Sequence, residues 1–386
     1  MTRPANRRAA GCRIGAGAGA RFRLVHLAAA AGALAACDTD RMAGPPPVEP
    51  AFAPGPKTAQ FAFTSNRDGN WEIYRVNADG TGLLRLTNHA ADDGPNGQGG
   101  YDIAWSPDGS QVAFTSNRSG SVDIWVMNAD GSRLTSLTNT AGNEHDLAWS
   151  PDGTRIAFAR KRPADIYPDI WFVTTTGKPA ETNLTATEYV DEVQPSWSSD
   201  GQSIAFRSDP IGWPDPPARI AVLHLDGGSV SSSDDWSARH TDPSWSPVGT
   251  PIAYISNADG DDDIHTFLPD GSLPTLLLDH AGADARPRWS PDGSKLVFEN
   301  TTTGTAGVWV VNSNGTSPLQ VALSGTAGPS WSRDGTRIAY ERHDTYVTQW
   351  EIRPVSDIYT VLPSGSSPLL VVPGPTSRNL HPVWRP

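Results

Sequence analysis

The chain has 386 residues, and its 37 glycines and 34 prolines make up more than one residue in six. Only 37% of the residues are hydrophobic, which argues against a helical bundle and against a protein that crosses a membrane many times. Residues 37–386 carry 24 Lys and Arg against 42 Asp and Glu, a net charge of −18 that disfavours nucleic-acid binding. A cationic partner or a metal ion suits this charge, although solubility alone also explains it.

The first 36 residues have the features of an export signal. Six arginines and no acidic residue precede an apolar stretch of 13 residues, 24–36, which is too short to span a membrane. The stretch ends in Leu34-Ala35-Ala36-Cys37, which resembles the box of bacterial lipoproteins, where the cysteine thiol receives diacylglycerol. The sequence therefore predicts a signal peptide over 1–36 and lipidation of Cys37. An ordinary signal peptide with an incidental cysteine is the alternative.

Residues 37–58 form the next segment. Six prolines between Pro45 and Pro56 predict a semi-rigid tether rather than a folded unit. The other cysteine, Cys12, would leave with the signal peptide, so the mature chain has no pair to oxidise and relies on its own core.

A repeat fills the rest of the chain, 59–386. Its clearest element is the pentapeptide Trp105-Ser106-Pro107-Asp108-Gly109, and successive tryptophans of this element lie 44, 48, 48, 44, 42 and 53 residues apart. The tryptophans of the repeat are Trp105, Trp149, Trp197, Trp245, Trp289, Trp331 and Trp384. This period is typical of a four-stranded propeller blade.

Each repeat has the same internal order. The pentapeptide predicts a tight hairpin, and a strand such as Val112-Ala113-Phe114 follows it. A third strand, such as Asp123-Ile124-Trp125, then leads to a turn at Asp-Gly or Asn-Gly and a short fourth strand. The N-terminal end of the repeat region lacks a first strand, and Pro382-Val383-Trp384 supplies one at the C-terminus. We therefore expect an all-β, seven-bladed propeller, closed by pairing the C-terminal strand with the N-terminal blade.

The repeat resembles the TolB-type, WD40-like propeller repeat, which also occurs in the propellers of prolyl-oligopeptidase-like enzymes. The resemblance covers about residues 59–386 and implies the fold more strongly than a function. TolB itself is a soluble periplasmic protein with an α/β domain before a six-bladed propeller. The lipoprotein box and the seven expected blades therefore imply a relative in fold.

The candidate binding residues lie at the start of the first strand of each blade, the strand nearest the channel of a propeller. Three residues before the tryptophans stand Asp102, Asp146, Gln194, Asp242, Arg286, Gly328 and His381. Five residues before them stand Gly100, Glu144, Glu192, His240, Asp284, Thr326 and Asn379. The acids among them predict a channel mouth that holds a cation or a basic side chain of a partner. The alternative is that they cap turns and solvate the rim.

Three loops between second and third strands are long, and they open on the same face. Blade three has 159–168, blade four 207–219 and blade seven 341–356, with Tyr167, Trp213, Tyr346 and Trp350 among them. Aromatic side chains on long loops favour a binding surface, of which Trp213 and Trp350 are the main candidates. Folding of these rings over the blade edge is the alternative.

Catalytic signatures are scarce. The sequence has no Gly-x-Ser-x-Gly, His-Glu-x-x-His, Cys-x-x-Cys or Walker motif. Asn257, Asp259, Asp261 and Asp263 alternate as in a calcium loop, but the glycine and the distal glutamate are misplaced for an EF-hand, which favours a polar loop. Seven-bladed oligogalacturonate lyases hold a metal with histidines near the channel, and here His145, His240 and His381 lie on non-consecutive blades.

The sequence thus predicts a non-enzymatic binding or scaffolding module, exported and anchored to a membrane by lipid, facing the periplasm or the cell exterior. We expect a monomer whose partner is an envelope protein or peptide, with a basic partner suited to the acidic charge, and no nucleic-acid partner. No cofactor is expected beyond a cation at the channel mouth. A metal-dependent carbohydrate-active enzyme is the alternative.

Overall fold

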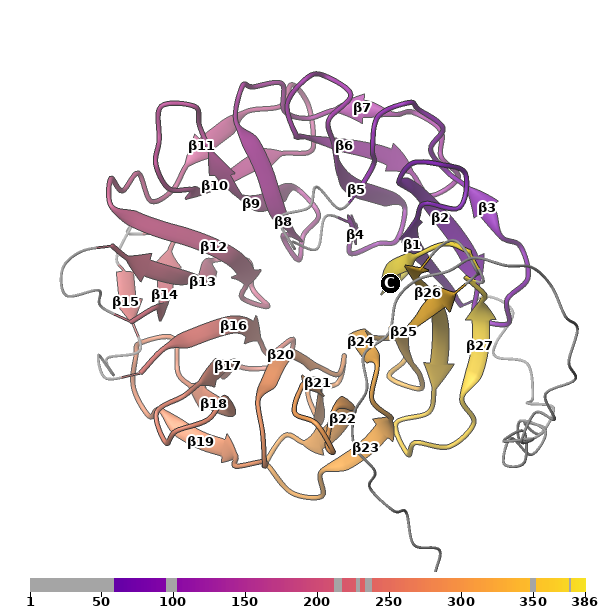
Figure 1. Ribbon diagram of the computed structural model, residues 1–386. Helices are drawn as coiled ribbons and strands as arrows, with labels where there is room; N and C mark the ends of the chain where they lie inside the picture. Colours follow the sequence, from indigo (N-terminus) through magenta and orange to yellow (C-terminus); the bar gives the residue numbers. More distant parts are fainter. Residues whose placement is uncertain are drawn as a thin grey trace, which may run out of the picture. The chain divides into compact units, whose positions relative to one another are not determined.

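The computed structural model describes residues 59–94, 103–211, 217–226, 230–232, 238–347, 352–374 and 376–386. These residues form seven antiparallel, four-stranded sheets arranged as blades around a central channel (Figure 1). The expected all-β, seven-bladed propeller is confirmed. No helix long and apolar enough to cross a membrane occurs in this part of the chain. Cys37 and the tether, with Asp102, Trp213 and Trp350, lie outside the described residues.

We number the blades in chain order. Blade 1 contains β28 (Asn379–Trp384), β1 (Gln60–Ser65), β2 (Glu72–Asn77) and β3 (Leu84–Arg85). Blade 2 contains β4 (Ile103–Trp105), β5 (Gln111–Ser116), β6 (Asp123–Asn128) and β7 (Thr135–Ser136). Blade 3 contains β8 (Asn143–Trp149), β9 (Arg155–Lys161), β10 (Asp169–Thr174) and β11 (Glu181–Asn183). Blade 4 contains β12 (Val190–Trp197), β13 (Ser203–Pro210), β14 (Arg219–His224) and β15 (Val230–Ser232).

The remaining blades follow the same order, with the innermost strand first. Blade 5 contains β16 (His240–Trp245), β17 (Ile252–Ser256), β18 (Asp263–Phe267) and β19 (Thr275–Leu278). Blade 6 contains β20 (Asp284–Trp289), β21 (Lys295–Asn300), β22 (Gly307–Asn312) and β23 (Leu319–Ala322). Blade 7 contains β24 (Thr326–Trp331), β25 (Ile338–Val347), β26 (Ile352–Val361) and β27 (Leu369–Val372).

The pentapeptide forms the predicted hairpin between the first two strands of a blade. In blade 2, Asp108 Oδ1 accepts hydrogen bonds from the Ser106 hydroxyl at 2.6 Å and from the Ser110 amide at 2.9 Å. The chain then reverses at Gly109, whose φ of 68° is left-handed and favours glycine. The same side-chain cap recurs at Asp152, Asp200, Asp292 and Asp334.

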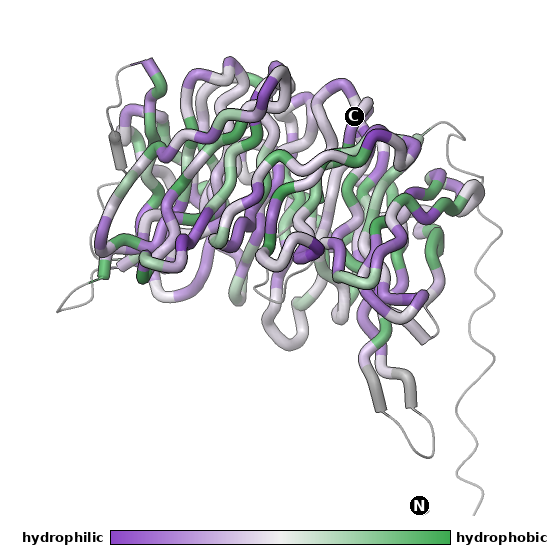
Figure 2. Tube along the Cα trace, turned by 90° about the horizontal axis from the view of Figure 1, so that it is seen from above, coloured by the Kyte–Doolittle hydropathy of each residue, from purple (hydrophilic) through white to green (hydrophobic). Residues whose placement is uncertain are grey.

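The repeated tryptophans join neighbouring blades. The indole of Trp149 donates to the carbonyl of Ala104 in the preceding blade at 3.2 Å, and equivalent bonds start from Trp105, Trp197, Trp289 and Trp331. Apolar side chains fill the space between the sheets, as where Val112 and Phe114 pack against Ile73 of blade 1. Figure 2 shows hydrophobic stretches recurring along the chain. The tryptophans are therefore structural.

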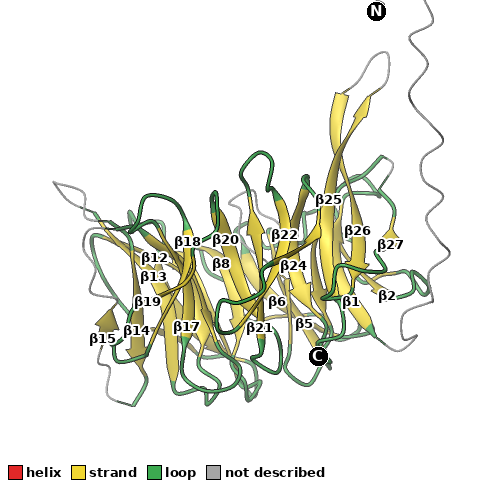
Figure 3. Cartoon of the chain, turned by 90° about the horizontal axis from the view of Figure 1, so that it is seen from below, coloured by secondary structure: helices red, strands yellow, loops and turns green. Residues whose placement is uncertain are grey.

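The ring closes as the sequence predicts. β28 pairs with β1, with Trp384 opposite Phe61 and Asn379 opposite Ser65. The rings of Phe61 and Trp384 meet edge to face with centroids 5.4 Å apart. One feature differs from the prediction: segment 341–356 is mostly a long hairpin rather than a loop, because β25 and β26 stay paired as far as Val347 and Ile352. Figure 3 shows this hairpin extending beyond the neighbouring strands.

Candidate functional site

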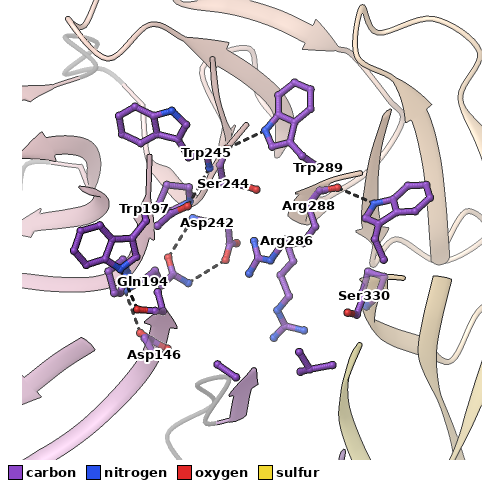
Figure 4. A pocket seen from close by; sticks show the side chains of 18 of the residues that line it. Asp146, Gln194, Trp197, Asp242, Ser244, Trp245, Arg286, Arg288, Trp289 and Ser330 are labelled. Carbon is purple, nitrogen blue, oxygen red and sulfur yellow. Dashed lines mark hydrogen bonds between the residues drawn. The ribbon is translucent and has the colours of Figure 1, made fainter. Parts of the chain in front are cut away.

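The first strands of all seven blades enclose a central cavity of about 970 Å³. Figure 4 shows part of its lining, in which Asp146, Gln194 and Asp242 come from three successive blades. Arg286 and Arg288 of β20 line the cavity next to them. The residues three positions before the tryptophans in blades 3 to 7 thus line the channel, as predicted for the innermost strand.

A β-bulge directs these side chains. In each first strand with a described start, the register against the second strand shifts, as between His145 and Ala148 in blade 3. The bulged residue has a left-handed φ of 53° to 61°, and the residues concerned are Asp146, Gln194, Asp242, Arg286, Gly328 and His381. A bulge disrupts the ladder and leaves a backbone amide in need of another partner.

In blades 4 and 5 that partner is the bulged side chain of the preceding blade. The Gln194 amide donates to Asp146 Oδ2 at 3.1 Å, and the Asp242 amide donates to Gln194 Oε1 at 3.1 Å. The Gln194 side chain also donates through Nε2 to Asp242 Oδ1 at 3.0 Å. We call this row of Asp146, Gln194 and Asp242 the acidic arc. Asp146 and Gln194 of the arc accept hydrogen bonds from backbone amides and also face the cavity. The same side chains can therefore stabilise the bulges and contact a ligand.

The bulge amides of blades 7 and 1 are satisfied differently. The preceding bulge positions hold Arg286, whose side chain only donates, and Gly328, which has no side chain. Glu299 of β21 accepts instead from the Gly328 amide at 2.7 Å, and Glu341 of β25 accepts from the His381 amide at 2.6 Å. A side chain at Gly328 would meet Glu341, because a Cβ built there lies 2.7 Å from Glu341 Oε1.

Sequence reasoning missed Glu299 and Glu341. Both follow the aromatic residue of an otherwise apolar second strand, where blade 1 has Thr64 and blade 3 has Ala159. A carboxylate in such a strand indicates a polar role inside the blade, because a buried carboxylate requires hydrogen-bond donors. Burial alone would raise the pKa of Glu341, but hydrogen bonds from the His343 ring and the His381 amide hold it below its ordinary value.

The channel is not uniformly acidic. Arg286 contacts Glu299, which also lines the cavity, at 3.2 Å, so Arg288 leaves the blade 6 side with a net positive charge. The negative side is the acidic arc of blades 3 to 5. The prediction of an acidic mouth therefore describes one side of the described wall, and a basic ligand would be attracted by the arc and repelled by the positive charge on β20.

The residues five positions before the tryptophans require correction. Glu144, Glu192, His240 and Asp284 are all buried, none lines the cavity, and their contacts are within and between blades. Glu144 accepts from Arg160 Nε at 2.7 Å and from Thr138 at 3.0 Å. The His240 ring packs edge to face on Tyr254 with centroids 5.2 Å apart. The sequence pattern cannot reveal this burial, which depends on the connector from the preceding blade.

Burial perturbs the acids of this set. It raises the pKa of Glu144 to about 7, although the guanidinium of Arg160 opposes the shift. It also raises the pKa of Glu192 to about 7 and that of Asp284 to about 8, against the Asn300 hydrogen bond in the second case. Such shifts occur at structural sites as well as functional ones, and these groups have no access to the cavity.

The face that carries the starts of the first strands has exposed apolar side chains over blades 3 and 4. Ile166 and Tyr189 are each 62% exposed, and Ile211 is 41% exposed. The Ile211 amide donates to the Tyr189 carbonyl at 2.8 Å, and the loop that holds Ile166 reaches β12 through a bond from the Glu192 amide to the Pro168 carbonyl. We call Ile166, Tyr189 and Ile211 the apolar patch. Tyr167 beside it is half-buried.

Among the described residues, the group with metal-ligand spacing includes none of His145, His240 and His381. His145 contacts Asp146 at 3.1 Å, His240 is buried on Tyr254, and His381 lies in blade 1. Among the described residues, the group of carboxylates with metal-ligand spacing lies elsewhere, at Asp259, Asp261 and Asp263.

Known propeller structures resemble this fold. TolB from Acinetobacter baumannii matches with a TM-score of 0.55 and 16% identity, over 82% of this chain and 80% of that one. An oligogalacturonate lyase in complex with manganese matches with a TM-score of 0.61 and 14% identity, over 83% and 86% of the two chains. A puromycin-hydrolyzing peptidase of Mycobacterium tuberculosis matches with a TM-score of 0.64 and 15% identity, over 83% of this chain and 53% of that one. At these identities the likeness concerns the fold alone.

Sequence comparison is more specific. A protein TolB homolog of Chlorobium luteolum is 31% identical over 204 residues, which are 53% of this chain and 34% of that protein. An uncharacterized protein of Agrobacterium fabrum is 32% identical over 208 residues, 52% of each chain. The chain thus matches about half or less of the length of these relatives. The family model of the TolB β-propeller domain matches residues 46–138 and 193–357. With most of its length matched, the chain belongs to the TolB β-propeller domain family.

Proposed function

We propose that this propeller binds a protein partner at the cell envelope, through the face formed by blades 3 to 5, while a lipid on Cys37 holds it to the membrane. The observation that carries the proposal is the pairing of two features in one sector. The acidic arc opens into the cavity from β8, β12 and β16, and the apolar patch lies over blades 3 and 4.

The two features have complementary uses. A carboxylate-rich wall attracts a basic segment at long range and accelerates association. Exposed Ile166, Tyr189 and Ile211 offer apolar area that a partner can remove from water, which slows dissociation. Membership of the TolB β-propeller domain family supports a binding role for the fold. A basic, partly apolar peptide or loop is the ligand that this sector would accept.

Anchoring is tested separately. In the proposed lipoprotein, Cys37→Ser abolishes labelling by a radioactive fatty acid and moves the protein from the membrane fraction to the soluble fraction. An unlabelled wild type, or a variant that keeps its label, would contradict the anchor while leaving the binding proposal intact.

Partner binding is tested by crosslinking in native membranes, followed by affinity capture with three proteins. Wild type is compared with Ile166→Ser/Tyr189→Ser/Ile211→Ser and with the control Leu134→Ser/Leu319→Ser, which removes exposed apolar side chains from outer parts of blades 2 and 6. The proposal requires one protein that is captured by wild type and by the control but lost with the triple variant. Equal capture by all three would exclude this face.

A further inference from the structure

The loop between β17 and β18 in blade 5 carries three carboxylates that face one another. An oxygen of each of Asp259, Asp261 and Asp263 lies within 4.8 Å of the other two. This span equals the distance between opposite ligands of a calcium ion that is about 2.4 Å from each oxygen. β17 and β18 are the second and third strands of the blade, so the loop lies away from the channel (Figure 1).

One carboxylate oxygen of Asp263, the buried residue of the three, has no hydrogen-bond partner among the described residues. Asp263 has no exposed surface, and its Oδ1 accepts from the His280 amide at 2.9 Å. Its Oδ2 is buried and has no hydrogen-bond partner among the described residues. An ionised oxygen in this state is costly unless a cation accompanies it.

Blade 2 shows what normally satisfies this position. Its loop has the same length and the same turn, with Gly120 in place of Gly260. There the Oδ2 of Asp123 accepts hydrogen bonds from the hydroxyls of Ser119 and Ser121. In blade 5 the corresponding residues are Asp259 and Asp261. Two donors are thus replaced by two acceptors, and carboxylates cannot donate to one another when ionised.

Blade 1 shows the same position with a cation supplied by the chain. Arg85 Nη1 contacts Asp68 Oδ2 at 3.1 Å and Arg85 Nη2 contacts Glu72 Oε1 at 2.7 Å, so one guanidinium bridges the loop to the start of the third strand. Arg85 pairs with Tyr74 in the sheet, and Leu276 holds this register position in blade 5, opposite His265. Blade 5 therefore has the acids of blade 1 without its arginine.

No other basic side chain of the described residues fills the gap. Ala258 stands where blades 1 and 2 have Arg67 and Arg118. Arg239 contacts Asp262 at 2.6 Å, and none of the ion pairs between described residues includes Asp259, Asp261 or Asp263. Asn257 is engaged by the Arg239 amide at 2.7 Å, so it does not extend the group as the alternating sequence suggested.

We infer that Asp259, Asp261 and Asp263 bind a divalent cation, with calcium as the expected ion. All donors are oxygens, and two of the three residues are exposed, so water completes the coordination sphere. Calcium is favoured over magnesium because the carboxylate oxygens are as far as 4.8 Å apart, which suits the longer calcium–oxygen distance. The ion takes the place that Arg85 holds in blade 1, and it ties the β17–β18 loop to the connector that leads to blade 6, where the Gly282 amide reaches Asp261 Oδ2 at 3.4 Å.

Calcium titration of the purified propeller tests this inference, with calorimetry and thermal unfolding as readouts. Wild type should bind one ion with a Kd of about 10⁻⁵ to 10⁻³ M, and at 100 times the Kd its folding equilibrium constant should rise about 100-fold. Asp259→Ser/Asp261→Ser introduces the hydroxyls that blade 2 has and should raise the Kd for calcium at least tenfold. Leu276→Arg introduces the arginine that blade 1 has and should also raise the Kd for calcium. Both variants should stay folded without calcium.

The control is Glu188→Ser/Asp344→Ser, which removes two exposed carboxylates elsewhere and should bind as wild type does. Magnesium at the same ionic strength should give a weaker response. The inference would be overturned if the melting temperature of wild type did not change in 10 mM calcium. It would also be overturned if the Asp259→Ser/Asp261→Ser variant bound calcium as wild type does. The second result would place any bound ion elsewhere, such as on the acidic arc.

Discussion

The β5–β6 loop of blade 2 and the β17–β18 loop of blade 5 have the same length and turn, but they differ in how they treat one buried carboxylate. The Asp123 carboxylate accepts hydrogen bonds from the hydroxyls of Ser119 and Ser121, from the Thr140 amide at 2.9 Å and from the Thr138 hydroxyl at 3.4 Å. Around Asp263 one amide donates and two carboxylates face it. The two loops share one backbone conformation because they belong to the same repeat. Where the side chains at equivalent positions change from donors to acceptors, the buried carboxylate requires a ligand.

Removing the satisfied carboxylate should have the largest effect. Asp123→Ala removes a fully buried carboxylate and leaves the Thr140 amide, the buried Thr138 hydroxyl and two serine hydroxyls without this acceptor, and we expect a loss of about 3 kcal/mol in the free energy of unfolding. Urea denaturation measures it. The loss should be the same with and without calcium, and a loss that calcium reverses would mean that the two loops do not differ as described.

The pH dependence of stability distinguishes satisfied from unsatisfied buried acids. Burial raises the pKa of Glu192 to about 7, so the folded protein holds a proton that the unfolded chain loses near pH 4.5. The stabilisation from this group is complete below pH 4.5 and is lost as the pH rises through 7. Glu192→Gln should therefore be more stable than wild type at pH 8 by about 2–3 kcal/mol, relative to the difference at pH 5.

Glu341 is an internal control for the direction in which pH changes stability. Its hydrogen bonds hold the pKa low, so its contribution should be lost as the pH falls, the reverse of Glu192. If Glu192→Gln leaves the pH profile of unfolding unchanged between pH 5 and 8, the donors around Glu192 suffice and the distinction between the two acids is wrong.

Transplanting the acids into blade 2 sharpens the comparison further. Ser119→Asp/Ser121→Asp should destabilise the calcium-free protein by about 1–2 kcal/mol through repulsion with Asp123, and calcium should reverse most of that loss. Thermal unfolding with and without calcium measures both effects. Destabilisation that calcium does not reverse would show that three carboxylates at this turn are insufficient for binding.

The smallest effect is expected on the channel wall. Asp146→Ala removes the acceptor of the Gln194 amide, but water in the cavity can replace it, so we expect a loss of about 1 kcal/mol. Asp146→Asn keeps an acceptor and should lose less. A loss as large as that of Asp123→Ala would mean that the arc is as structural as the buried carboxylates.

Local signals in the sequence were sufficient for the fold. The Trp-Ser-Pro-Asp-Gly turns, the period of the tryptophans and the unpaired strands at the two ends predict seven blades and the pairing of Trp384 with Phe61, because hairpins and closure depend on patterns within one repeat. The site was predicted less well. Asp146 and Asp242 line the channel, but Glu144 and Asp284 are buried by connectors from the preceding blade, which no single repeat contains.

The carboxylates of blade 5 show the same limit. The spacing of Asp259, Asp261 and Asp263 alone favours a polar loop, because it does not match an EF-hand. What distinguishes this loop is the absence of the arginine at Leu276 and of the serine hydroxyls of blade 2. These differences become visible only when the strand register aligns the blades.

A crystal structure of the propeller grown in calcium, or in manganese with anomalous data, tests the central claim most directly. We predict one ion about 2.3–2.6 Å from oxygens of Asp259, Asp261 and Asp263, and no ion at Ser119, Ser121 and Asp123. Density for a cation only in the channel, or none at the β17–β18 loop in millimolar calcium, would contradict it.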